Sequence, residues 1–353
     1  MAMHGFSLTP GRINRYKGQI MAHAVPMECL SKGGRQVKFP KNSSDTYVSR
    51  RWVPFGATAA QPNTFFGTVT AVDRGNSLVV AHQTAEGITS IPESIVPMDI
   101  SVVMQQYSCL YGFTDKTYDM YEDDIPQAMV EQIGQRVTLV NEMVMFGTLK
   151  ASTNVFFGGT GTSRATVNGG ISLPMLRRIG RSLMANHASM VTRVLNAGNR
   201  FGTDPVAAGF IVYLSTDLEP DVRDLPGFIP AEKYASGTPM ANELGKVERF
   251  RFITSPDLIA ILDGGAAVGA TGLQSNLNTS VDVYQFIVTA EDAWSQVAVR
   301  GTDVLDPTFL PPGQKSKSDP HGQRGYAGTT WWKAAQIENN GWMAVGNVGA
   351  RAL

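Results

Sequence analysis

Apolar residues in the stretch 123–152 recur with the period of an α-helix. At about 100° per residue they fall within one wide arc, with polar residues opposite. The apolar arc holds Ile125, Met129, Val130, Ile133, Val137, Val140, Met143 and Val144, and the polar side holds Glu131, Gln135, Thr138 and Glu142. Asp123 or Asp124 can cap the helix, and Pro126 suits a first turn, where its missing N–H costs nothing. The pattern predicts a helix over residues 124–150, which rises about 37 Å from Ile125 to Leu149 and forms a strut lying on a flat surface.

Before this helix the pattern is that of β-strands. Residues 47–54 favour a strand, and two β-rich runs within 64–82 flank the turn sequence Asp73-Arg74-Gly75-Asn76, which predicts a hairpin. The return segment 86–119 predicts further strand leading directly into the long helix. A hairpin between paired strands next to a strut indicates an extended subunit.

After the helix the pattern becomes that of an α/β body. An amphipathic helix is expected over 173–188 and a short one over 217–225. Strands are expected over 208–216, 247–258, 281–290 and 293–300, with 330–348 forming two strands or one long bent one. Residues 9–24 predict a short basic helix in a head region with too few periodic apolar residues to fold alone, so an arm that orders on a neighbour is expected there. The fold class is α+β.

Charge is balanced over the whole chain and unevenly distributed along it. The 353 residues carry 30 Lys and Arg against 30 Asp and Glu. Residues 1–51 hold nine basic residues against Glu28 and Asp45, a net charge of +7 that the rest of the chain offsets with −7. This asymmetry favours a polyanion or an acidic neighbour as partner, although a solvated basic face is an equally simple reading.

No pattern of catalytic or cofactor-binding residues is found in the sequence. The five histidines are scattered without a metal-ligand partner, and two cysteines form neither a disulfide framework nor a zinc site. The Gly-rich stretches 158–162 and 264–272 lack the phosphate-loop ending, and no nucleophile elbow occurs. No apolar run has the length of a membrane span, and no signal-peptide pattern is found in the first residues, so a soluble protein from a reducing compartment is expected. We expect no enzyme activity, no cofactor and no metal.

Several motifs downstream of residue 45 resemble a family of tailed-phage major capsid proteins. They are STDLEPDVRDLPGFIPAEKYASG, ELGKVERFRFITSPDL, VYQFIVTAEDAWSQVAVRG and SDPHGQRGYAGTTWWKA. This family is typified by the capsid protein of coliphage N-four and has the Hong Kong 97-type fold. The segment from Ser49 through EGITSIPESIV into the long helix is similar to the family as well.

The resemblance implies a division of the chain into the parts of such a capsid subunit. It implies an N-terminal arm over 1–48, an extended loop over 54–100 and an axial domain over 155–290. The peripheral domain would consist of 101–154, which contains the spine helix 124–150, together with 291–353. The arm residues expected to face DNA or contact a neighbour are Arg12, Arg15, Lys17, Lys32, Arg35, Lys38 and Lys41.

The function implied is that of a structural protein which assembles into an icosahedral phage head around double-stranded DNA. Expected partners are copies of itself as hexamers and pentamers and the packaged DNA, with portal, scaffolding and decoration proteins as further candidates and no membrane. The expected location is the virion, after assembly in the cytoplasm of the bacterial host. Two alternatives are an encapsulin-type compartment of the same fold and a phosphate-binding enzyme. The basic arm favours the phage protein over the compartment, because a protein cargo does not require an excess of positive charge.

Overall fold

The structure is a computed structural model of the 353-residue chain. It describes residues 26–54, 57, 62–63, 83–84, 86–87, 89, 94–120, 125–195, 203–234, 239–269, 272–299, 307–315 and 317–352. The basic helix expected over 9–24, the hairpin over 64–82 and the capping residues Asp123 and Asp124 lie outside the described residues.

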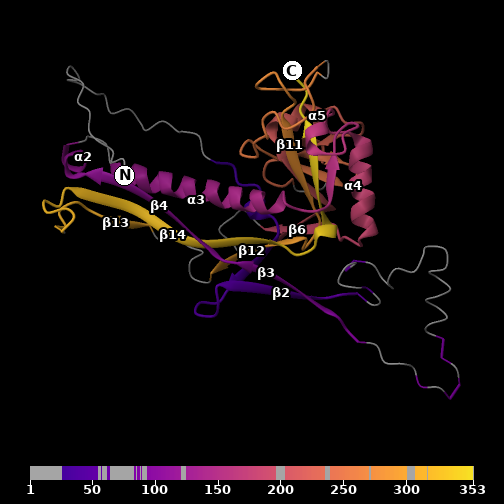
Figure 1. The fold of residues 1–353 in the computed structure, drawn as a ribbon, viewed down its shortest axis with the longest axis horizontal. Coiled ribbons are helices and arrows are strands. Elements are labelled where there is room, and N and C mark those ends of the chain that lie inside the picture. Colours follow the sequence, from indigo (N-terminus) through magenta and orange to yellow (C-terminus); the bar gives the residue numbers. More distant parts are fainter. Residues whose placement is uncertain are drawn as a thin grey trace.

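A long helix and two large sheets organise the described part of the chain (Figure 1). The helices are α2 (Asp115–Met120), α3 (Ile125–Leu149), α4 (Leu173–Ala185) and α5 (Glu219–Arg223), with short 3₁₀ turns η1 (Leu30–Lys32), η2 (Arg164–Thr166), η3 (Thr216–Leu218), η4 (Ala231–Lys233) and η5 (Asn340–Trp342). The strands are β1 (Arg35–Phe39), β2 (Thr46–Trp52), β3 (Pro97–Val103), β4 (Gln105–Thr114), β5 (Val155–Phe157), β6 (Val191–Leu195), β7 (Thr203–Ser215), β8 (Ile229–Pro230), β9 (Glu243–Val247), β10 (Phe250–Ser255), β11 (Val283–Thr289), β12 (Trp294–Val299), β13 (Thr308–Leu310), β14 (Arg324–Ile337) and β15 (Met343–Gly349).

The helix α3 and a five-stranded sheet form the elongated half of the molecule. In this sheet β14 pairs with β12 and β13 on one side and with β4 on the other, and β1 adds in parallel beyond β12. Met129, Ile133 and Val137 of α3 are buried against Phe113 of β4 and Trp331 of β14. Because these helix positions are four residues apart, they form one narrow stripe along the sheet. The predicted strut on a flat surface is therefore confirmed, with a helix of 25 residues.

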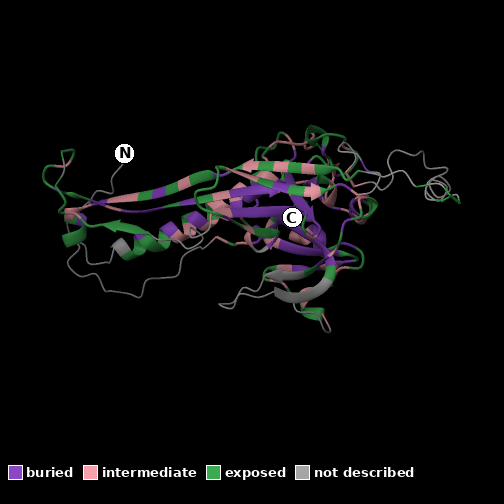
Figure 2. Ribbon diagram, turned by 90° about the horizontal axis from the view of Figure 1, so that it is seen from below, coloured by how far each residue is buried: buried purple, intermediate pink, exposed green. Residues whose placement is uncertain are grey.

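The more compact half is an eight-stranded mixed sheet in the order β5-β15-β11-β7-β10-β9-β8, with β6 beside β7. Helix α4 buries Met175, Leu176, Ile179 and Leu183 in the hydrophobic core of this sheet, at the i, i+3, i+4 spacing of an amphipathic helix. Figure 2 shows that buried residues concentrate here, whereas buried and exposed residues alternate along the elongated half.

Four sequence-based expectations need correction. Residues 115–120, expected to continue a strand, form α2, where Thr114 Oγ1 accepts a hydrogen bond from the Thr117 N–H at 3.3 Å and starts the turn. Val130, expected in the apolar arc, is exposed, since the buried stripe on the sheet is narrower than the arc. Glu142, expected on the polar side, is 1% exposed. The helix expected over 173–188 ends at Ala185. Of the two alternatives for 330–348, the structure has the two strands, β14 and β15.

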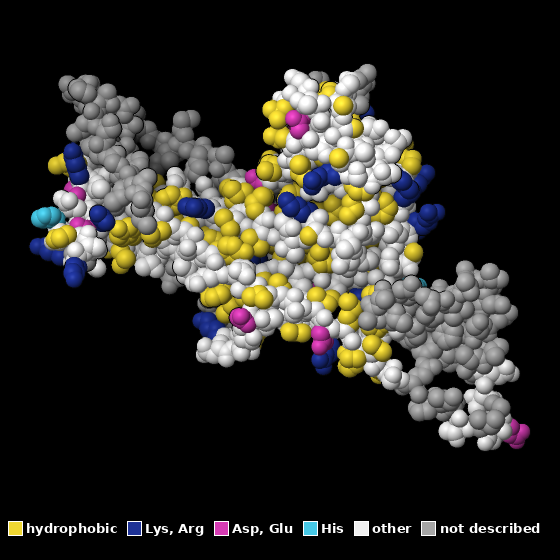
Figure 3. Space-filling view, in the orientation of Figure 1, with side chains coloured by type: hydrophobic (Ala, Val, Ile, Leu, Met, Phe, Trp, Pro, Cys, Tyr) yellow, Lys and Arg dark blue, Asp and Glu magenta, His cyan; other side chains and the backbone are white. Residues whose placement is uncertain are grey.

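The domain bounds stay a prediction, and the sheets show how the chain is distributed between the two halves. Strand β15, which falls in the range expected for the peripheral domain, lies between β5 and β11 in the eight-stranded sheet. Strand β1, which falls in the expected arm, pairs with β12 of the same chain over Arg35–Phe39. The space-filling view in Figure 3 shows basic side chains at the far end of the elongated half and hydrophobic side chains scattered along this face.

Candidate functional site

The basic residues predicted as the arm site fall into two groups. Arg12, Arg15 and Lys17 lie outside the described residues. Lys32 ends η1, and Arg35 and Lys38 lie on β1, so this half of the predicted arm is part of the sheet of its own subunit. The Arg35 Nη2 atom lies 3.4 Å from Glu338 Oε1 of the same chain. That Lys32, Arg35, Lys38 and Lys41 face DNA or a neighbour stays a prediction.

Lys41 lies at the rim of a cavity between the turn after β1 and the outer face of the five-stranded sheet. The cavity has a volume of about 460 Å³ and is also lined by Phe39, Asp45, Met104 and Trp332. Its side chains are mainly apolar, with one exposed cation and one exposed carboxylate at the edge.

The buried carboxylate of Glu142 binds the backbone of residues 29–31. Glu142 Oε1 accepts hydrogen bonds from the N–H groups of Cys29 and Leu30, both at 2.6 Å. Its Oε2 atom accepts a third from the Ser31 N–H at 3.1 Å. A buried carboxylate needs such donors, because removal of the charge from water is otherwise very unfavourable. The stretch that enters η1 is thereby fixed to the C-terminal third of the long helix.

The side chain of Gln296 on β12 binds the same stretch from the opposite direction. Its Nε2 atom lies 3.2, 2.9 and 2.6 Å from the carbonyl oxygens of Leu30, Ser31 and Gly33, and these three acceptors share its two hydrogens. The Lys333 Nζ atom on the neighbouring strand β14 donates to Gln296 Oε1 at 2.9 Å, which fixes the orientation of the amide. We call Glu142 and Gln296 together the backbone clamp, and residues 27–33 the docked segment.

Burial sets the protonation of the groups around the clamp. Burial, and then the neighbouring Glu142 carboxylate, raise the pKa of the Cys29 thiol well above its usual range. Burial, followed by the charges of Cys29 and Glu142, likewise raises the pKa of Tyr213 on β7. Burial lowers the pKa of Lys333, against the opposing effect of the Glu28 and Glu142 carboxylates. The thiol and the phenol are therefore neutral at physiological pH.

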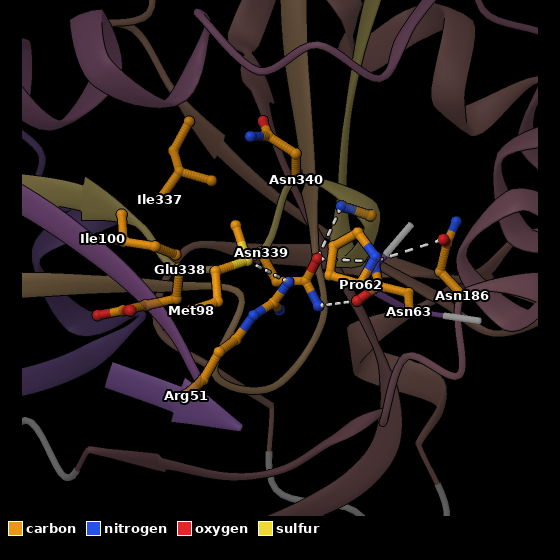
Figure 4. A pocket seen from close by; sticks show the side chains of 11 residues that line it. Arg51, Pro62, Asn63, Met98, Ile100, Asn186, Ile337, Glu338, Asn339 and Asn340 are labelled. Carbon is orange, nitrogen blue, oxygen red and sulfur yellow. Dashed lines mark hydrogen bonds between the residues drawn. The ribbon is translucent and has the colours of Figure 1, made fainter. Parts of the chain in front are cut away.

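A second cavity, of about 530 Å³, lies where β2, β3, the end of α4 and η5 meet (Figure 4). Two side-chain amides exchange hydrogen bonds there, since Asn63 and Asn339 each donate to the other at 2.8 and 2.7 Å. Asn63 also donates to Asn186 at 3.4 Å. Arg51 lines the cavity on the side of β2, and burial lowers the pKa of its guanidinium. These contacts attach Asn63, in the range predicted for the extended loop, to both halves of the subunit.

The eight-stranded sheet contains a buried ion pair. Arg251 on β10 donates from Nε and Nη2 to the two carboxylate oxygens of Glu243 on β9, at 2.8 and 2.6 Å. The Tyr234 hydroxyl and the Met240 N–H also donate to Glu243, both at 2.7 Å. Four donors around one carboxylate hold the chain on either side of the segment 235–238.

The described part of the chain offers no metal centre, since no three His, Cys, Asp or Glu side chains lie close enough together to bind an ion. Among these residues, no helix is both long enough and apolar enough to cross a membrane.

Comparison with known proteins identifies the fold. No family model matches the chain. The capsid of Ralstonia phage GP4 superposes with a TM-score of 0.63 at 10% identity, over 97% of this chain and 96% of that one. The capsid of Cyanophage Pam1 superposes with a TM-score of 0.57 at 13% identity, over 99% of this chain and all of that one. The chain has the Hong Kong 97-type capsid fold.

A curated relative is also a capsid protein. The major capsid protein of Pseudomonas phage KPP21 is 21% identical in an alignment of 260 positions that covers 69% of this chain. The match spans 65% of the length of that relative. The finer resemblance, to the family of coliphage N-four, stays a prediction.

Within this capsid fold, the backbone clamp is the feature that sequence reasoning missed. Periodicity placed Glu142 on the solvent side of the spine helix. The apolar stripe of a helix identifies only the face that packs on the sheet, and it does not reveal a chain segment that covers another face. The single signal in the sequence is the pair Gly33-Gly34, which indicates a close approach of backbone to a neighbouring element. In the structure a Cβ atom on Gly33 would collide with the Tyr213 hydroxyl, and Gly34 has φ +69° beside the ring of Trp294.

Proposed function

We propose that this chain is the major capsid protein of a tailed bacteriophage, which self-assembles into the icosahedral head shell enclosing double-stranded DNA. The observation that carries the proposal is the full-length agreement with phage capsid chains, 97% of this chain in the case of Ralstonia phage GP4. The name of the Pseudomonas phage KPP21 relative points to the same role. The role is structural and not enzymatic, in line with the sequence, which holds no catalytic constellation.

The surface of the isolated subunit supports assembly with copies of itself. Large apolar side chains are exposed on both halves, including Trp52, Ile95, Leu110, Ile259 and Leu277, each more than half exposed. An assembly interface typically buries such side chains at its centre. In the proposed shell, hexamers and pentamers of this chain cover these surfaces, and a stiff spine helix keeps each subunit flat.

The basic N-terminal arm is proposed to face the packaged DNA or an acidic neighbour. Its net charge of +7 over residues 1–51 is the motivating observation. Neutralisation of Arg12, Arg15 and Lys17 together should leave the subunit folded and lower the yield of shells or their DNA content. Normal, fully packaged heads from this triple variant would refute the assignment. Portal, scaffolding and decoration proteins are further partners within this proposal, and the virion, assembled in the bacterial cytoplasm, is its location.

Electron microscopy of the expressed protein tests the proposed function directly. Closed shells or curved sheets in negative stain are the expected result, and a protein that stays monomeric under all assembly conditions would contradict it. The nucleic-acid content of native particles then distinguishes a phage head from an encapsulin-type compartment. No feature of this chain favours the compartment. Particles that hold protein cargo and no DNA would favour the compartment.

A further inference from the structure

The docked segment lies between the two large sheets of the subunit. At its start, the Met27 N–H donates to Asp257 Oδ2 at 2.8 Å, and the Met27 carbonyl accepts from Ser255 Oγ at 3.2 Å, both at the end of β10 in the eight-stranded sheet. At its other end, the Gly33 carbonyl accepts from Gln296 on β12 in the five-stranded sheet. Seven residues of chain therefore connect β10 of the eight-stranded sheet with β12 of the five-stranded sheet.

The side chains of the docked segment fit this space closely. Leu30 is fully buried, in a hydrophobic cluster with Met145 of α3, Tyr213 of β7 and Trp294 of β12. Gly33 and Gly34 pass so close to these rings that neither position has room for a side chain. Since protein interiors are close-packed, a change in the angle between the sheets would either open a cavity around Leu30 or compress the glycines.

The backbone clamp holds the docked segment by its peptide groups alone. Glu142 takes three N–H groups and Gln296 approaches three carbonyls, so the position of the segment is set on both sides. Glu142 belongs to the spine helix, and its carboxylate is in none of the ion pairs of the described residues. Loss of the carboxylate charge therefore weakens the grip on the segment without breaking an ion pair among those residues.

We propose that the docked segment is a wedge, held by Glu142 and Gln296, that sets the angle between the eight-stranded and five-stranded sheets. In a closed shell the shape of each subunit fixes the curvature with which copies join. The wedge thereby restricts the diameter of the particle. The role of the wedge within the single subunit follows from the contacts of Glu142 and Gln296, and its effect on particle diameter rests on the proposed function.

The substitution Glu142→Gln tests the wedge, with Glu131→Gln as the control. Both changes remove one negative charge from the same helix, but Glu131 is exposed. Hydrogen exchange at the amides of residues 29–31 should rise at least about tenfold in Glu142→Gln and stay unchanged in the control, because a buried hydrogen bond to a charged group shifts local opening by about that factor or more. Unchanged exchange in both variants would mean that the clamp does not hold the segment.

The angle itself is measured in the unassembled subunit by the distance between two spin labels. The substitutions Leu262→Cys and Leu110→Cys place labels on the two halves at half-exposed sites, while the native Cys29 and Cys109 are buried. A distance distribution at least about twice as wide in Glu142→Gln as in Glu131→Gln is expected. Faster exchange with an unchanged distribution would overturn the proposal. If Glu142→Gln is insoluble, Gln296→Met, which removes the carbonyl contacts at similar volume, serves in its place with the same two outcomes.

Particle diameter provides the readout in the shell. Glu142→Gln shells should show a broader range of diameters than control shells in electron micrographs. A wider label distribution combined with shells of uniform, normal diameter would refute the role in curvature and keep the role in the subunit. Wild-type protein that forms no shells would instead refute the proposed function, and the label distances would still decide the wedge.

Discussion

Removal of one partner from the buried pair Arg251–Glu243 should destabilise the compact half strongly. The two side chains are 4% and 0% exposed, so the substitution Arg251→Met leaves the Glu243 carboxylate buried with two neutral donors, Tyr234 and Met240. A buried charge left without its partner costs about 3–5 kcal/mol. For a chain of this length we expect about 2 °C of melting temperature per kcal/mol, and thus a shift of about 6–10 °C.

The double variant Arg251→Met/Glu243→Gln separates the charge from the packing. Because the glutamine is neutral and still accepts from Tyr234, the double variant should be more stable than Arg251→Met alone by about 1–3 kcal/mol. Urea unfolding of the unassembled subunit is followed by tryptophan fluorescence and circular dichroism. It provides the free energies of unfolding of the wild type, of the two single variants and of the double variant, which together form a double-mutant cycle. A double variant that is no more stable than the single one would refute the reasoning, since the loss would then come from packing of the arginine stem.

Three further outcomes are expected. Val137→Pro in the middle of α3 should cost about 3 kcal/mol or more and yield insoluble or unassembled protein, so wild-type shells from it would contradict a continuous, required spine helix. Because burial raises the pKa of Cys29 and of Tyr213, the stability linked to these neutral groups is complete at pH values below their ordinary pKa values and is lost as the pH rises above those values. In a Cys109→Ser background, thiol labelling of Cys29 should therefore begin only at alkaline pH. Rapid labelling at pH 7 would contradict the burial of this thiol. Mature heads should give a single band near 38.1 kDa after boiling in denaturant, because residues 42–115 contain no lysine to form a covalent lock to a neighbour, and a ladder of multimers would contradict this.

The elements with strong periodicity were predictable from the sequence. The spine helix was expected over 124–150 and is observed over Ile125–Leu149, because its apolar stripe and the missing donor of Pro126 act within a few turns of chain. The strands β11 and β12 and the helix α4 were predicted for the same reason. The helix α2 was missed because the strand and the helix there share one short run of mixed polarity, and local side-chain hydrogen bonds decide between them.

The arm illustrates what local patterns cannot provide. The scarcity of periodic apolar residues predicted that the head region would not fold alone and would order on a neighbour, yet residues 35–39 pair with β12 of the same chain. A sequence shows that a stretch lacks its own core, and it does not show which surface supplies one. In this chain the supplying surface is built from residues more than 100 positions away, as with Glu142 and its partners Cys29 and Leu30.

The clamp also explains why a glutamate is tolerated at position 142. A carboxylate at a fully covered site is unfavourable unless its lone pairs are used, and on a helix face against a sheet no free donors exist because strand N–H groups are already paired. Only a stretch that leaves its N–H groups unpaired can supply them, and the entry into the 3₁₀ turn η1 is such a stretch. Glu142 therefore disfavours every arrangement in which α3 is covered by another strand or by side chains alone. The charge contributes specificity for one chain segment at one place, at some cost in stability compared with an apolar residue.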